Sequence, residues 1–137
     1  MNCIGNGLSC TKNYNLDLNN DTNNDFILTA FRVAPLQIGL DKYSNVTASP
    51  LNGNAVKILV NSINVSIPLQ FNTVIDSNLL LNQSWQTSGS QSLKNGIYGG
   101  SSSDTVWGLW DSLADYYLGL RILQSGQTYY GWVEIAR

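Results

Sequence analysis

Short apolar segments separated by turn-forming residues dominate this sequence and restrict the folds open to it. Segments rich in β-branched and aromatic residues occupy residues 26–36, 55–60, 63–67 and 71–75, with Asn, Gly, Ser or Pro between them. No long amphipathic helix and no internal repeat is visible. Closely spaced short strands are typical of β-sandwiches and barrels, so we expect an all-β fold.

The composition supports strands and turns rather than helices. Hydrophobic residues make up 43% of the chain and charged residues only 12%, so 17 Asn, 15 Ser and 8 Thr supply most of the polarity. Asn and Ser side chains compete for backbone hydrogen bonds and favour turns. At 137 residues the chain has the length of one domain. We therefore predict a single antiparallel β-sandwich over residues 1–137, jelly-roll-like or lectin-like.

The clearest local pattern lies at the C-terminal end. Residues 116–123 and 128–136 flank Ser125 and Gly126, which suit a two-residue turn, so we predict a β-hairpin. In the register of that turn the opposed pairs are Leu118 and Val133, Tyr116 and Ile135, Leu120 and Gly131, Gly119 and Trp132, and Arg121 and Tyr130. The first three pairs form an apolar face, and Arg121 lies diagonal to Trp132, which predicts cation–π contact.

Three segments before the hairpin carry weaker patterns. Residues 79–85 are ambiguous, because an apolar run ends in polar residues. Residues 86–104 are rich in Gly and Ser, which predicts long loops with one short strand at most. Residues 111–115 suit a single helical turn.

The charge distribution argues against two classes of partner. The formal net charge is −2 and no basic cluster is present, which argues against nucleic-acid binding because phosphate neutralisation needs grouped Lys and Arg. No apolar run approaches the roughly 20 residues of a membrane-spanning helix. The first ten residues lack a basic region followed by an apolar core. We expect a secreted or cell-surface protein whose signal peptide is not part of this sequence.

Two cysteines, Cys3 and Cys10, lie in the N-terminal segment 1–13. Without histidine they make a poor zinc site, so they form either a disulfide or two free thiols. The composition of the remaining chain is typical of an extracellular protein, which favours a Cys3–Cys10 disulfide.

The chain contains no histidine, and this limits its catalytic chemistry. Serine–histidine and cysteine–histidine pairs and histidine-ligated metal sites are excluded. Acids outside residues 17–25 are spread singly, at Asp41, Asp76, Asp104, Asp111, Asp115 and Glu134. A glycosidase would need a carboxylate pair among them, and single surface acids are the commoner case. We expect a non-enzymatic protein.

Residues 17–25 read D-L-N-N-D-T-N-N-D and match the spacing of a calcium loop. A loop of the EF-hand type takes side-chain oxygens from positions 1, 3, 5 and 9 and a backbone carbonyl from position 7. These positions hold Asp17, Asn19, Asp21, Asp25 and Asn23. Thr22 replaces the usual glycine and Leu28 the closing glutamate, so another ligand must come from elsewhere. The alternative is a solvated turn, for which Asn and Asp are also common.

Two motifs together resemble a group of uncharacterised secreted bacterial proteins. These are N-L-D-L-N-N-D-T-N-N-D-F near the start and Y-L-G-L-R-I-L-Q-S-G-Q-T-Y-Y-G-W-V-E-I at the end. The resemblance implies an exported β-rich domain with a calcium-type loop whose side-chain ligands are Asp17, Asn19, Asp21 and Asp25. It also implies that Gly119, Gly131 and Trp132 are structural residues of the hairpin.

Aromatic residues offer a different interpretation. Sugar-binding sandwiches stack flat rings on pyranose faces and use amide side chains to bind hydroxyls. Trp85, Trp107 and Trp110 are the candidates for such a site, although tryptophans more often fill the core. We expect a non-enzymatic extracellular domain with one calcium and an adhesion or accessory role. The alternative is a carbohydrate-binding or carbohydrate-active module, so an extracellular glycan or a cell-surface component is the expected partner.

Overall fold

The computed structural model describes residues 3–4, 9–33, 42–60, 65–98, 105–110 and 116–135, and these residues contain strands but no helix. The all-β prediction is therefore confirmed. The strands are β1 (Cys3–Ile4), β2 (Ser9–Leu16), β3 (Phe26–Val33), β4 (Lys42–Pro50), β5 (Ala55–Leu59), β6 (Val65–Ser66), β7 (Pro68–Leu69), β8 (Gln83–Gln86), β9 (Gln91–Tyr98), β10 (Thr105–Trp107), β11 (Tyr116–Gln124) and β12 (Gln127–Ile135).

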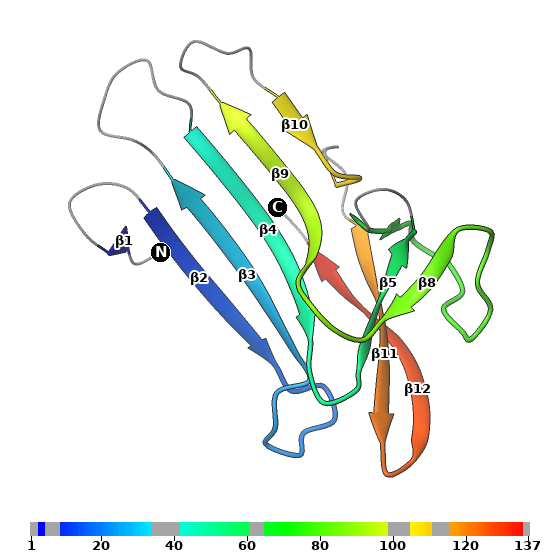
Figure 1. Cartoon of the computed structure of the whole chain (residues 1–137). Coiled ribbons are helices and arrows are strands. Elements are labelled where there is room, and N and C mark those ends of the chain that lie inside the picture. The colour runs from blue at the N-terminus through cyan, green and yellow to red at the C-terminus, as the bar shows by residue number, and fades with distance from the viewer. Residues whose placement is uncertain are drawn as a thin grey trace.

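The strands form one sheet in the order β1-β2-β3-β4-β9-β6-β5-β11-β12, while β10 pairs with β9, β7 with β11 and β8 with β5. The described strand pairs are antiparallel, except that β6 runs parallel to β9. Figure 1 shows β2, β3, β4 and β9 side by side in one half, with β5, β8, β11 and β12 forming the other half of the open, curled sheet.

Both halves of the sheet contribute to one hydrophobic core. Phe26, Ala48 and Leu93 come from β3, β4 and β9, while Leu118 and Leu120 come from β11. All five side chains are buried. Further core residues are Val56, Ile58 and Trp110, with Leu16, Leu28, Val46, Tyr116, Ile122, Val133 and Ile135 packed around them. Because strands far apart in the sheet share this core, burial of their apolar faces stabilises the curl.

A β-bulge lies where the sheet bends. The register of β4 and β9 shifts between Val46 and Thr47, so Leu93 is the extra residue of β9. Bulges increase local twist and bend a strand. Gly108 packs on this bulge with φ of +111°, and a Cβ there would lie 2.5 Å from the carbonyl oxygen of Leu93. Only glycine fits both the backbone angle and the space.

β11 and β12 pair over their whole length through Ser125 and Gly126. Both turn residues have positive φ, 50° and 76°, as a type I′ turn requires. The opposed residues are Leu118 and Val133, Tyr116 and Ile135, Leu120 and Gly131, Gly119 and Trp132, and Arg121 and Tyr130.

The expected contact between Arg121 and Trp132 is not the one found. The Arg121 guanidinium carbon lies 5.9 Å from the ring centroid of Trp85 on β8. The register of the hairpin gives only contacts between β11 and β12. Trp85 comes close to Arg121 because β8 pairs with β5, which the hairpin sequence does not show.

Two sequence-based segment predictions are wrong. Residues 71–75 were expected to form a strand, but Phe71 and Asn72 form a turn, and Phe71 and Val74 are each 77% exposed. Residues 86–104 were expected to be mostly loop, yet β9 is eight residues long. β9 is stabilised by pairing with β4 and β10, which the Gly- and Ser-rich segment around it does not reveal. The helical turn expected at 111–115 lies outside the described residues.

At the N-terminal end Cys10 is disulfide-bonded. The sequence has one other cysteine, Cys3, which lies opposite Cys10 in the register of β1 and β2. The bond therefore joins β1 to the edge of the sheet. Within the described part of the chain, no helix is long and apolar enough to cross a membrane.

Candidate functional site

Residues 17–25 form the loop that joins β2 to β3. The last pair of these strands is Leu16 and Phe26, and the Asp25 amide donates a 2.7 Å hydrogen bond to the Leu16 carbonyl. The loop is therefore closed at its base by regular strand pairing. Its conformation is set by its own polar side chains.

Asp17 organises the first half of the loop. Its Oδ1 accepts a hydrogen bond from the Asp21 amide at 3.2 Å, and its Oδ2 accepts one from the Thr22 amide at 2.9 Å. Asp21 in turn accepts from the Asn23 amide at 2.9 Å and from the Asn19 side chain at 3.1 Å. These contacts wind the chain around Asp17 and Asp21. Each carboxylate oxygen retains a second lone pair for another donor or a cation.

The backbone turns sharply at Thr22, which has φ of +72°. In the left-handed region a β-branched residue is disfavoured by about 1–2 kcal/mol, whereas glycine is not. Position 6 of an EF-hand loop, which Thr22 occupies, is the one where glycine makes the sharp turn. With Thr22 in place of glycine, the backbone still makes the sharp turn, but with local strain.

Asp25 is buried at the base of the loop, and its carboxylate bonds both to the loop and to the protein beneath it. Its side chain is 4% exposed, and Oδ2 accepts a 2.8 Å hydrogen bond from the Leu18 amide. Oδ1 accepts a 2.8 Å bond from Nδ2 of Asn54, which is also buried. Asn54 Oδ1 accepts a bond from the Leu123 amide on β11. The Asp25–Asn54 pair therefore connects the loop to the C-terminal hairpin.

The five predicted calcium ligands differ in exposure. Asp17 and Asn19 are half-buried, Asp21 and Asn23 are exposed, and Asp25 is buried. In the described part of the chain, no three Asp, Glu, His or Cys side chains are grouped closely enough to hold a metal ion. Hydrogen bonds link Asp17, Asn19, Asp21 and Asn23 to one another, while the Asp25 carboxylate is bound to Leu18 and Asn54. Whether calcium binds here stays a prediction.

Of the three tryptophans proposed as a ligand face, Trp110 lies in the core. Trp110 is 7% exposed, donates a 2.9 Å hydrogen bond from Nε1 to the Ser66 carbonyl, and packs edge-on against Tyr116. These are properties of a core residue. Of Trp107 only the backbone is described, in β10.

Trp85 is half-buried beneath other side chains. Lys57 Nζ and the Arg121 guanidinium each lie 5.9 Å from its ring centroid, and the Tyr130 ring lies 5.4 Å away. Three side chains thus surround the Trp85 indole and cover part of it. Trp85 therefore contributes to the structure through cation–π contacts with Lys57 and Arg121.

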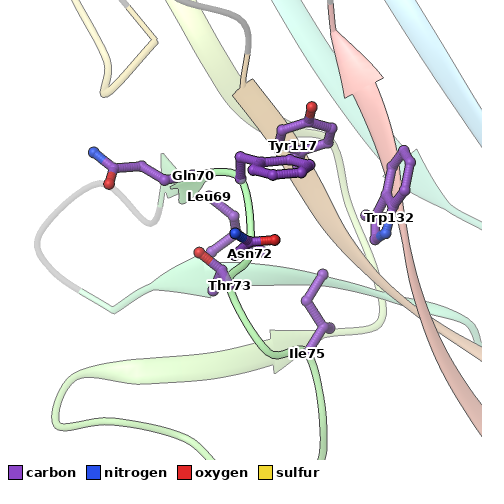
Figure 2. A pocket seen from close by; sticks show the side chains of 8 residues that line it. Leu69, Gln70, Asn72, Thr73, Ile75, Tyr117 and Trp132 are labelled. Carbon is purple, nitrogen blue, oxygen red and sulfur yellow. The ribbon is translucent and has the colours of Figure 1, made fainter.

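A pocket that the sequence did not predict lies between the 70–75 segment and the outer face of β11 and β12 (Figure 2). Its volume is about 180 Å³. The Tyr117 and Trp132 rings meet edge to face with centroids 5.0 Å apart, and Phe71 lies 6.4 Å from Tyr117. The lining residues are Leu69, Gln70, Phe71, Asn72, Thr73, Ile75, Tyr117 and Trp132.

Polar and aromatic groups meet across the mouth of this pocket. Figure 2 shows the Asn72 amide and Ile75 on the side opposite Trp132, with Tyr117 at one end and Gln70 directed away. Trp132 is 58% exposed and Phe71 is 77% exposed. Two large rings exposed beside a pocket are unusual for a surface that only contacts water.

The sequence predicted neither side of the pocket as a binding surface. Residues 71–75 were expected to form a strand, and the resemblance implied that Trp132 is a structural residue of the hairpin, where it does lie. A usable signal was the hairpin register itself, because Trp132 opposes Gly119 and lies on the face opposite to the apolar pairs. A large aromatic ring on the solvent-facing side of a strand can bind a ligand.

None of the eight residues that line the pocket is charged. The arrangement supplies ring faces, an amide and a hydroxyl, which suit binding by stacking and hydrogen bonding. It supplies no carboxylate pair for acid–base chemistry.

Comparison of the chain with protein-family models, curated proteins and solved structures gives no significant match.

Proposed function

We propose that the chain is a non-enzymatic extracellular or cell-surface binding domain, with an adhesion or accessory role, whose partner is a glycan. The observation that carries the proposal is the exposed aromatic surface of Phe71 and Trp132 on a rigid β scaffold. Binding domains of this kind hold ligands on aromatic side chains beside a few polar groups. The absence of histidine from the chain fits a binding rather than a hydrolytic role.

The proposal includes a finer description of the fold. The two halves of the curled sheet act as the two layers of a jelly-roll-like or lectin-like sandwich, because both contribute to one core. The pocket lies on the outside of the layer that contains β11 and β12, away from this core. The ligand face can therefore vary in sequence without loss of the fold.

A calcium ion in loop 17–25 is the second element of the proposal. Asp17, Asn19 and Asp21 would supply side-chain oxygens and Asn23 its carbonyl. Asp25 suits position 9, where a water often intervenes, because its carboxylate is already held by Leu18 and Asn54. The positive φ of Thr22 at position 6 supports this assignment. The ion would act on stability, since the loop joins β2 to β3 rather than lining the pocket.

A glycan array of the folded protein tests the proposal. We expect binding to one class of neutral glycan, retained after EDTA treatment at a temperature well below the melting point. The absence of binding to any immobilised glycan at a protein concentration of about 1 mM would contradict a carbohydrate function, because weak lectin-type sites bind near that range.

A further inference from the structure

The pocket between residues 70–75 and β12 has features of a specific subsite for one sugar ring. We propose that it binds a neutral pyranose, with Trp132 as the stacking surface and the Asn72 amide as the group that reads hydroxyls. This inference rests on the proposed glycan-binding function and assigns it a place, a ligand class and a specificity residue.

The stacking surface is argued from exposure and ring geometry. Trp132 meets Tyr117 at an interplanar angle of 82°, so the edge of one ring is covered by the other while more than half of the indole stays exposed. Trp132 lies next to Gly131 in β12, and its backbone is paired regularly with Gly119 of β11. The ring is thus fixed before any ligand arrives, which lowers the entropy lost on binding.

Asn72 supplies the polar group on the opposite wall. Its backbone has φ of +67°, a conformation that Asn tolerates better than most residues. The turn is closed by a 3.1 Å hydrogen bond from the Thr73 amide to the Gln70 carbonyl. An amide both donates and accepts hydrogen bonds, which matches adjacent sugar hydroxyls. Figure 2 shows the amide directed toward the Trp132 side of the pocket.

The charge of the site selects a neutral sugar. All eight lining residues are uncharged, and Glu134, the strand partner of Tyr117, is an exposed acid beside them. No cation lines the pocket to offset a carboxylate or a sulfate on the ligand. Uronic acids, sialic acids and sulfated sugars should therefore bind less well than neutral hexoses or pentoses.

A proline-rich peptide is the competing occupant, because such peptides also bind aromatic-lined grooves. Those peptides present apolar rings and carbonyl oxygens that only accept hydrogen bonds, whereas an amide can both donate and accept. The position of Asn72 opposite Trp132 favours a ligand with several hydroxyls. The peptide is therefore an outcome of the test rather than a part of the proposal.

Calorimetry with hexasaccharides of glucose, xylose, mannose and N-acetylglucosamine, and with a proline-rich decapeptide, tests the subsite. We expect one sugar series to bind the wild type and Trp132→Ala to weaken it at least about tenfold. Asn72→Gly removes the amide while allowing positive φ, and should weaken binding about three- to tenfold. Tyr129→Ala is the matched control, since Tyr129 is an exposed ring on the opposite face of β12.

The outcomes separate the subsite from the function. Unchanged sugar affinity in both Trp132→Ala and Asn72→Gly, with folding verified by melting temperature, would overturn the subsite while leaving glycan binding intact. Binding of the decapeptide but of no hexasaccharide would overturn both. Loss of affinity in Tyr129→Ala equal to that in Trp132→Ala would show a general folding effect and also contradict the subsite.

Discussion

Asn54 donates a 2.8 Å hydrogen bond from Nδ2 to Oδ1 of Asp25, and both side chains are buried. Asn54 lies just before β5, while Asp25 ends the loop before β3. The same amide accepts a 2.8 Å bond from the Leu123 amide. One side chain therefore holds the loop, the start of β5 and the hairpin in a fixed arrangement.

Asn54→Ala should lower the free energy of unfolding by about 2–3 kcal/mol. The change leaves the buried Asp25 carboxylate short of a donor and the Leu123 amide without its acceptor. Urea unfolding measures the effect. Asn52→Gly is the matched control, because Asn52 donates to the Asn24 carbonyl on the exposed side of the same turn, and glycine tolerates its φ of +54°, so the change should cost less than about 1 kcal/mol. Equal losses in both variants would contradict the role of the buried pair.

Calcium should raise the melting temperature slightly. Extracellular loops of this kind bind with dissociation constants of about 10⁻⁴ to 10⁻³ M, and the lack of glycine at Thr22 and of glutamate at Leu28 suits this weak range. A calcium concentration tenfold above the dissociation constant adds about 1.4 kcal/mol to stability. Asp21→Asn keeps the acceptor for the Asn23 amide but removes a charge, so it should reduce or abolish the shift.

Asp76→Asn is the matched control for calcium. Asp76 also accepts hydrogen bonds within its own turn, from the amide and the side chain of Asn78, but lies outside loop 17–25. Its variant should keep the full calcium shift. If calcium and EDTA samples of the wild type melt at the same temperature, and calorimetry shows no heat, the loop is a polar turn without a metal.

Gly119→Ala should destabilise the protein by about 1–3 kcal/mol, since overpacking forces neighbours to move. A Cβ at Gly119 would lie 3.0 Å from Leu69 Cδ1 and 3.2 Å from Lys57 Cβ. Gly131→Ala is the control on the partner strand, because a Cβ there meets nothing within 4 Å. Its effect on the free energy of unfolding, measured in urea, should stay within about 0.5 kcal/mol. The opposite ranking of the two variants would contradict the packing of β7 and β5 on β11.

Local chemistry made parts of the fold predictable from sequence. Ser125 and Gly126 suit a type I′ turn, and once the turn is placed, every opposed pair of β11 and β12 follows from counting. The all-β class follows from composition in the same way. Long-range pairing is different: β9 contains Gly and Lys and gains its stability from β4 and β10, which no window of the sequence contains.

The candidate site was harder to predict because exposure depends on the whole fold. Residues 71–75 have the composition of a strand, yet no neighbouring edge pairs with them, so Phe71 remains exposed. From the sequence alone, Trp110 and Trp132 are equally plausible as ligand-binding residues. Its burial against Ser66 and Tyr116 is decided by segments far away in sequence.

The proposal requires that Trp132 meets the ligand while Trp110 stays in the core. The most direct measurement is a ¹⁵N–¹H spectrum of the tryptophan indole groups during titration with the hexasaccharide that binds best. We expect the Trp132 signal, assigned through Trp132→Phe, to shift with the binding isotherm while the buried Trp110 signal stays fixed. A shift of the Trp85 or Trp107 signal with Trp132 unchanged would contradict the account.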